Sequence, residues 1–175
     1  MTEAQLSNAM DAYGSTVYRL ALTRMQNIAD AEDVYQEGFL RLWKQAAEDW
    51  DGDRAKAWLI RTTLNRCADL HRFRLRRPVL SFAEIPDLAQ PEDESRELWE
   101  AVSRLPEKAR TAVHLYYAEG YSTEEISHLM HIPAATVRTR LHRARKQLKE
   151  LLGGIDDETC VSRSDGTNFG PQRAE

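Results

Sequence analysis

Apolar residues along this chain recur at the spacing of amphipathic helices, and almost no segment alternates as a β-strand would. A first helix is expected over about 7–25, because its apolar side chains return near every third or fourth position. Two more helices are expected over about 30–46 and 54–73, with Asp30 as the N-cap of the earlier one. The pattern predicts an all-α fold.

Four further helices are expected from about residue 96. Pro106 ends a short one, and the next covers about 107–118 with Gly120 as its C-terminal cap. Ser122 and Glu125 have the spacing of a capping box, which opens a third helix. The tripeptide 131–133 breaks it, and a last helix runs from about 133 to 152 with Pro133 in its first turn.

Residues 78–95 contain three prolines, many acids and no sustained period, so they are predicted to be a flexible linker. The linker divides the chain into two small helical domains, 1–77 and 96–152. The polar segment 153–175 is predicted to be a disordered tail. No apolar run of about 18 residues and no secretory signal occur, so a cytoplasmic location is expected.

The net charge of −4 conceals two basic segments. Residues 54–77 carry eight basic side chains against Asp69 alone, and residues 134–149 carry six with no acid. Acidic segments surround both. Two separate basic segments predict two contact points on a polyanion.

The segment 122–146 has the pattern of a helix-turn-helix, because two short helices meet at a tight break and the second is strongly basic. Its apolar positions are expected to fix the helix crossing; they are Ile126, Ile132, Val137 and Leu141. A continuous strip then points away from that core and can enter a major groove, where arginine pairs with guanine. The strip consists of Arg138, Thr139, His142 and Arg143. The other cations, Arg140, Arg145, Lys146 and Lys149, suit phosphate contacts.

The basic helix 54–77 interleaves arginines with Trp58 and Phe73, a combination that single-stranded DNA binding requires. The packing of Trp58 in the core is the stronger interpretation of that residue. Asn65 and Asp69 fit either base reading or plain solvation. The acidic strip 32–41 of the preceding helix fits two interpretations, an ordinary solvent-exposed surface or a protein-docking face.

No enzyme, cofactor, metal site or small-molecule substrate is expected. The five histidines are scattered, and no phosphate loop or catalytic triad order occurs. Cys67 and His71 are four residues apart on one helix, but no further ligand lies near them in sequence. Cys67 and Cys160 are expected to be reduced thiols. A stand-alone helix-turn-helix regulator remains an alternative, although it accounts only for 122–149.

Three motifs in order resemble the sigma-70 family of RNA polymerase sigma factors. AEDVYQEGFL at 31–40 and AWLIR at 57–61, with the arginines through Arg77, are similar to region 2. LPE at 105–107 and GYSTEEISHLMHIPAATVRTRLHRAR at 120–145 are similar to region 4. The resemblance covers about 8–152 and lacks regions 1.1 and 3, which is typical of the extracytoplasmic-function (ECF) group. It implies a region 2 bundle and a region 4 helix-turn-helix.

The resemblance also implies partners and site residues. Core RNA polymerase would bind through its β′ clamp helices to Asp33, Gln36, Glu37 and Arg41, and through its β flap to region 4. The −10 element would contact Arg61, Asn65, Asp69, His71, Arg72, Arg74, Arg76 and Arg77, with a flipped base held in a loop at 71–77. The −35 element would contact Pro133, Ala135, Thr136, Arg138, Thr139, His142 and Arg143.

Two further expectations follow from the resemblance. The linker would thread the polymerase, and an anti-sigma factor would hold the protein silent. Gly38 departs from the family pattern, because a small aliphatic side chain is usual there, and glycine inside a helix costs up to about 1 kcal/mol against alanine.

Overall fold

The computed structural model describes residues 2–45, 52–76 and 93–153, and nearly all of them are helical. Three long helices form an N-terminal unit: α1 (Glu3–Met25), α2 (Ile28–Lys44) and α3 (Gly52–Arg76). A C-terminal unit follows with α4 (Asp93–Ser103), α5 (Glu107–Val113), the π-helical turn η1 (His114–Ala118), α6 (Thr123–Met130) and α7 (Ala134–Leu151). No strand occurs within these ranges, so the all-α prediction is confirmed.

Local signals explain most helix boundaries. Thr2 and Gln5 cap α1 reciprocally, and Ser122 and Glu125 form the predicted capping box of α6. His131 adopts a left-handed conformation with φ 51°, which breaks the chain between α6 and α7. Gly120 and Gly153 have φ of +74° and +73°, conformations that glycine adopts without strain at helix ends.

Several predicted boundaries are wrong, each for a physical reason. The N-cap of α2 is Asn27, whose side chain accepts from the Asp30 amide, so Asp30 lies in the first turn instead. Pro133 is the N-cap residue of α7 and precedes its first turn. Residues 71–76 are helical and form no loop, because leucine and arginine are good helix formers and no proline occurs before Pro78.

Most of the predicted linker and of the tail lies outside the described residues. Helix α4 begins at Asp93, three positions before its predicted start at Arg96. The predicted helix over 107–118 is divided, because its last five residues form the π-helical turn η1.

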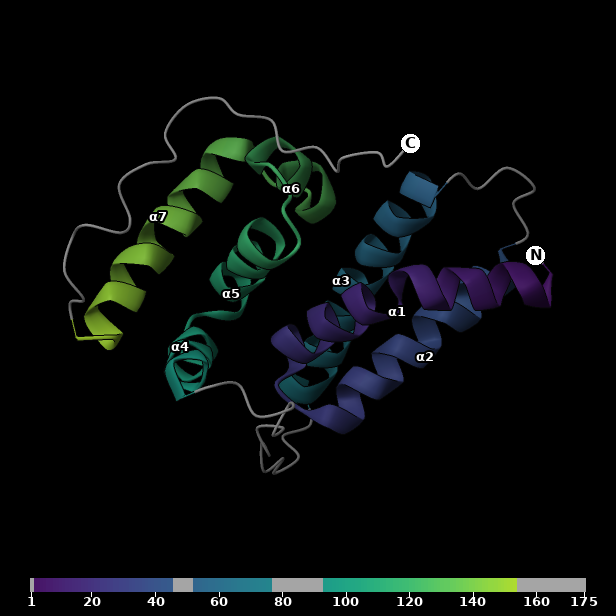
Figure 1. Cartoon of the computed structure of the whole chain (residues 1–175), viewed down its shortest axis with the longest axis horizontal. Coiled ribbons are helices and arrows are strands. Elements are labelled where there is room, and N and C mark those ends of the chain that lie inside the picture. The colour runs from purple at the N-terminus through teal and green to yellow at the C-terminus, as the bar shows by residue number, and fades with distance from the viewer. Residues whose placement is uncertain (1, 46–51, 77–92, 154–175) are drawn as a thin grey trace.

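The two units pack against one another (Figure 1), with α5 lying between α7 and the N-terminal unit. Helix α5 and η1 contact α1, and α6 contacts α3. One hydrophobic core therefore spans both units: Leu20, Ile60 and Leu64 join Leu115, Ile126 and Val137. Two smaller cores lie within the N-terminal unit and contain Val34, Phe39 and Leu42 of α2.

Candidate nucleic-acid interface

Helix α7 presents a polar strip on the face opposite its core. Val137 and Leu141 are buried at 0% and 2% exposure and pack with Ile126 of α6, as the sequence predicts. Their burial turns the rest of the helix outward. The exposed residues of the strip are Pro133, Ala135, Arg138, Thr139, His142 and Arg143, and Thr136 is partly exposed. A straight helix with four neighbouring donor side chains is suited to a major groove.

Only one residue of that strip has an ion-pair partner outside α7 among the described residues. Arg138 Nη1 lies 3.2 Å from Glu124 Oε1 at the start of α6. Both side chains are well exposed, so the pair is weak and solvent-screened. Arg138 therefore remains available for an anionic ligand.

Helix α3 carries the second predicted nucleic-acid surface, and the structure places four of its eight residues on one exposed strip. These are Arg61, Asn65, Asp69 and Arg72. Their spacing of three and four residues aligns them along the helix axis. Arg72 Nη2 donates to Asp69 Oδ1 at 2.5 Å, so one cation of the strip has an internal acid partner.

Two of the other four residues, His71 and Arg74, do not join that strip. His71 is partly buried and faces the C-terminal unit, with Nε2 3.7 Å from Glu107 Oε2. Arg74 forms an ion pair with Asp30 at the start of α2. Arg76 is the last residue of α3, and Arg77 lies outside the described residues.

Trp58 and Phe73 differ in their surroundings. Trp58 is partly buried and packs against the core formed by Val17, Phe39 and Leu59, so the core interpretation of this residue is confirmed. Phe73 is 55% exposed. The helix thus combines an exposed aromatic ring with arginines, as single-strand-binding surfaces do.

Helix α2 holds its acidic strip at the surface. Asp33, Gln36 and Arg41 are exposed, and Glu37 is partly exposed. Leu40 and Trp43 lie on the same side at 58% and 40% exposure, which the charge pattern alone did not indicate. Exposed apolar side chains bordered by charges are typical of a protein-docking surface.

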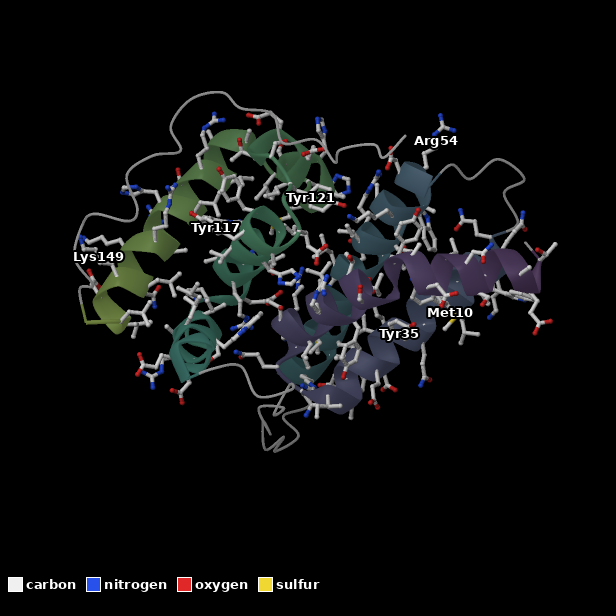
Figure 2. The ribbon with its side chains drawn as sticks, in the orientation of Figure 1. Met10, Tyr35, Arg54, Tyr117, Tyr121 and Lys149 are labelled. Carbon is white, nitrogen blue, oxygen red and sulfur yellow. The ribbon has the colours of Figure 1, made fainter. Side chains whose placement is uncertain are left out.

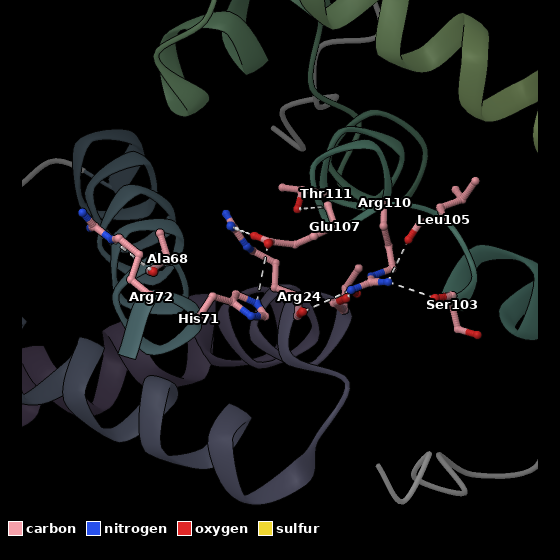
Figure 3. Close-up of polar contacts among 10 residues, drawn as sticks. Arg24, Ala68, His71, Arg72, Ser103, Leu105, Glu107, Arg110 and Thr111 are labelled. Atoms are coloured by element: carbon pink, nitrogen blue, oxygen red, sulfur yellow. Dashed lines mark hydrogen bonds and ion pairs between the residues drawn. The ribbon is translucent and has the colours of Figure 1, made fainter. Parts of the chain in front are cut away.

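Arg110 joins the two units and was not singled out by the sequence. Its guanidinium donates to the backbone carbonyls of Thr23 and Arg24 at the end of α1, of Ser103 at the end of α4, and of Leu105 just after it (Figure 3). The last carbonyls of a helix lack partners within that helix, so one buried cation satisfies two helix ends. Burial and the nearby Arg24 lower the pKa of Arg110 to about 10.

A second polar cluster lies where η1 meets α1. Glu119 accepts from the Thr16 hydroxyl at 2.9 Å and from Arg19 at 3.2 Å, and its Oε1 lies 3.6 Å from His114 Nε2. These contacts, that with His114 above all, lower the pKa of Glu119 to about 2. Thr23 pairs with His114 Nδ1 at 3.3 Å. The interface is therefore polar as well as apolar.

Further contacts extend the interface along α3. Lys56 lies 5.2 Å from the ring centroid of Tyr121, which Figure 2 shows near α6. Burial, as the main cause, raises the pKa of Tyr121 to about 12. Arg24 pairs with Glu107 near His71, as Figure 3 shows. The interface thus occupies a flank of α3 and leaves the strip that contains Arg61 exposed.

Cys67 is completely buried within the N-terminal unit, and burial raises the pKa of its thiol to about 11. Such a thiol is inert toward oxidants and electrophiles. Among the described residues, no helix has the length and apolar content needed to cross a membrane.

Both units match known family models. Residues 9–77 match Sigma-70 region 2, and residues 95–148 match Sigma-70, region 4. The ECF RNA polymerase sigma factor SigM of Bacillus subtilis is 32% identical over 155 residues, which cover 83% of this chain and 94% of SigM. The chain belongs to the ECF sigma factors of the sigma-70 family.

Other sigma factors agree with this assignment. SigL of Mycobacterium tuberculosis is 31% identical over 160 residues, covering 86% of this chain and 90% of SigL. SigE of Mycolicibacterium smegmatis is 34% identical over 161 residues, and the match spans 86% of this chain but 62% of SigE. Because region 2 is present as well as region 4, the alternative of a stand-alone helix-turn-helix regulator is wrong.

Two solved structures share the fold. CnrH, in complex with the cytosolic domain of CnrY, is 25% identical with a TM-score of 0.63, and the match covers 89% of this chain and 92% of CnrH. RpoE of Bartonella quintana, in complex with the anti-sigma factor NepR, has a TM-score of 0.72 at 24% identity, covering 85% of this chain and 97% of RpoE. The N-terminal unit is thus region 2 of a sigma factor, and the C-terminal unit is region 4.

Proposed function

We propose that this sigma factor binds core RNA polymerase through the exposed strip of α2 and then directs it to promoters. Asp33, Gln36, Glu37 and Arg41 would contact the β′ clamp helices. Leu40 and Trp43 support this role, because they add apolar surface that only a partner can cover. Electrostatic complementarity predicts a basic partner surface opposite Asp33 and Glu37.

Promoter recognition would be divided between α3 and α7. The strip containing Arg61, Asn65, Asp69 and Arg72 would contact the melted −10 strand, on which Phe73 could stack. The strip containing Arg138 and Arg143 would read base edges of the −35 element, with the other cations of α7 on phosphates. Residues 1–77 and 96–152 would be the two functional domains, and 78–95 the linker.

Family membership supports further roles. The β flap would cover apolar surface of region 4, for which Leu98 and Trp99 on α4 are available at 47% and 49% exposure. An anti-sigma factor would keep the protein silent; this is supported by RpoE, which is solved with the anti-sigma factor NepR. The protein would act in the cytoplasm, where polymerase works, and would carry out no catalysis of its own.

The presence of two exposed basic surfaces on two separate helical units carries this proposal. Run-off transcription with core polymerase and a library of promoter fragments tests it. Transcripts that require the protein would support the proposal, and their start sites would reveal both promoter elements. Failure to bind core or to direct any transcript would overturn it.

Asp33 provides a sharper test of the polymerase surface. Asp33→Ala removes an exposed acid of the strip, so core binding should weaken by about 10-fold while the fold is retained. Glu3→Ala is the matched control, because Glu3 is an exposed acid at the start of α1 and far from the strip in sequence. Equal losses for both variants would argue against docking on α2.

A further inference from the structure

Glu37 of α2 contacts two arginines at once, one from its own helix and one from α3. Its Oε1 accepts from Arg41 Nη2 at 2.6 Å, and its Oε2 lies 2.5 Å from Arg66 Nε. Both carboxylate oxygens are therefore occupied in the free protein. Arg41 and Glu37 belong to the proposed polymerase surface, whereas Arg66 belongs to the basic helix that carries the −10 strip.

The pair between Glu37 and Arg66 is the more enclosed of the two. Both side chains are 31% exposed, whereas Arg41 is 48% exposed. The Arg66 Nε atom is buried and has no hydrogen-bond partner, so its contact with Glu37 is an ion pair without a well-aligned hydrogen bond. Salt screens a partly buried ion pair less than an exposed one, so this pair holds the Arg66 guanidinium against α2.

Arg66 lies at the edge of the exposed strip of α3. It directly follows Asn65, so its side chain leaves the helix about 100° further around the axis. The side chain is long and flexible, and without Glu37 it could turn toward the strip. Arg66 is thus a cation on the nucleic-acid helix that is directed away from nucleic acid by an acid of the polymerase surface.

We propose that Arg66 is a phosphate-binding residue that Glu37 holds back in the free protein, and that docking of polymerase on Glu37 releases it. A partner cation that pairs with Glu37 would share the carboxylate charge that holds Arg66, and so would weaken the ion pair between Glu37 and Arg66. Polymerase binding would therefore add one phosphate contact to region 2. This inference rests on the proposed role of Glu37 in polymerase binding.

A neighbouring ion pair serves as an internal comparison. Arg74 of α3 pairs with Asp30 of α2, whose side chain is 15% exposed and whose Oδ2 has no access to solvent. Asp30 lies outside the polymerase strip. Polymerase docking would leave this pair intact, so the release is specific to Arg66.

The free full-length protein provides the first test, with a labelled single-stranded oligonucleotide of mixed sequence as the probe. Glu37→Gln keeps the shape of the side chain and removes its charge, so Arg66 should become free. Affinity at low salt should rise about 5-fold, and the slope of log K against log salt should steepen by about 0.7, the value for one added phosphate contact on a single strand. Glu32→Gln is the matched control, because Glu32 is an exposed acid of the same helix with no ion-pair partner among the described residues.

A double-variant cycle separates release of Arg66 from simple loss of a negative charge. In an Arg66→Gln background, Glu37→Gln should no longer raise affinity or steepen the salt slope. Equal gains for Glu37→Gln and Glu32→Gln would overturn the proposal. A gain that persists when Arg66 is replaced would also overturn it.

Core polymerase provides the second test. Arg66→Gln should raise the affinity for core, because docking no longer has to displace Arg66 from Glu37, and should weaken binding of the holoenzyme to the same oligonucleotide about 5-fold. Weaker core binding with unchanged oligonucleotide binding would overturn the role of Arg66. If the wild-type protein does not bind core, the proposed function fails, whereas the cycle in the free protein still decides whether Glu37 restrains Arg66.

Discussion

The Nε atom of Arg110 donates to the backbone carbonyl of Thr23 across 2.5 Å, and so fixes α5 to the carboxyl end of α1. The same guanidinium donates to three more backbone carbonyls. Regions 2 and 4 are therefore joined by four hydrogen bonds from one side chain to the backbone. Carbonyl acceptors do not neutralise the charge of Arg110, so its stability at this position depends on the hydrogen bonds. These bonds are sensitive to any change in the geometry of the donor.

Arg110→Lys should destabilise the closed arrangement of regions 2 and 4. A lysine keeps the charge but cannot donate to four carbonyls in the plane of a guanidinium, so buried acceptors lose their partners at a cost of about 2–4 kcal/mol. Urea denaturation measures the free energy of unfolding, and small-angle scattering measures the opening of the two units. Arg104→Lys is the control at an exposed position near the same turn. Equal effects of the two substitutions would contradict the structural role of Arg110.

The sequence contained the signals for most of the helices but not for the contact between the two units. Apolar periodicity and the capping residues Ser122 and Glu125 predicted α6 and α7, because those signals are local. Arg110 and Glu119 looked like ordinary surface charges within their helix. Only the tertiary structure brings Thr16 and Thr23 of α1 next to them.

Part of the candidate nucleic-acid interface could also be predicted from the sequence. The strip of α7 was predicted correctly as exposed, because Val137 and Leu141 define the buried face. For α3 the sequence could not separate the exposed residues from the paired ones, because a helix rich in arginines gives no indication of which of them form ion pairs. Arg74 meets Asp30 and Arg66 meets Glu37 only after α2 packs on α3.

Acid should weaken the contact between η1 and α1 through protonation of Glu119. Its pKa falls from 4.5 to about 2, and its side chain is 5% exposed. A lowered native pKa stabilises the folded state above the unfolded value, and that stability is lost as the pH falls from about 4.5 to about 2. The lowered pKa of Glu119 corresponds to about 3 kcal/mol in the free energy of unfolding at neutral pH.

Glu119→Gln tests this linkage. The wild-type protein should be the more stable at pH 7, and the difference between the two proteins should vanish as the pH approaches 2. Urea denaturation at a series of pH values measures this difference in the free energy of unfolding. Glu150→Gln is the control, because Glu150 is exposed near the end of α7. A difference between wild type and Glu119→Gln that is independent of pH would show that the carboxylate charge is not responsible.

Gly38→Ala should stabilise region 2. Gly38 is buried within α2, and an added Cβ would meet nothing within 4 Å, so alanine fits without displacing a neighbour. Alanine loses less conformational entropy on folding, and the gain should be up to about 1 kcal/mol in the free energy of unfolding. Thermal denaturation measures it as a higher Tm.

Gly14→Ala is the comparison for that substitution. Gly14 is also buried in a helix, but an added Cβ would lie 3.0 Å from the Tyr35 hydroxyl oxygen. Tyr35 packs edge-on against Tyr18 and contacts Phe39, and its hydroxyl would have to move by a few tenths of an ångström to admit the new Cβ. The close contact with Tyr35 should offset the entropic gain of Gly14→Ala. A Tm increase equal to that of Gly38→Ala would contradict the packing of Tyr35 against Gly14.

Arg143 and Lys146 of α7 should affect promoter binding in different ways. Both are exposed cations, but Arg143 belongs to the strip that would face base edges, whereas Lys146 lies nearer the carboxyl end of the helix and suits a phosphate. Arg143→Ala should relax the choice of base at one position of the −35 element by about 1–3 kcal/mol. Lys146→Ala should weaken binding to all sequences equally and reduce the slope of log K against log salt by about 0.9. Holoenzyme binding to a library of −35 variants at several salt concentrations measures both effects, and uniform weakening by Arg143→Ala would assign Arg143 to the DNA backbone instead.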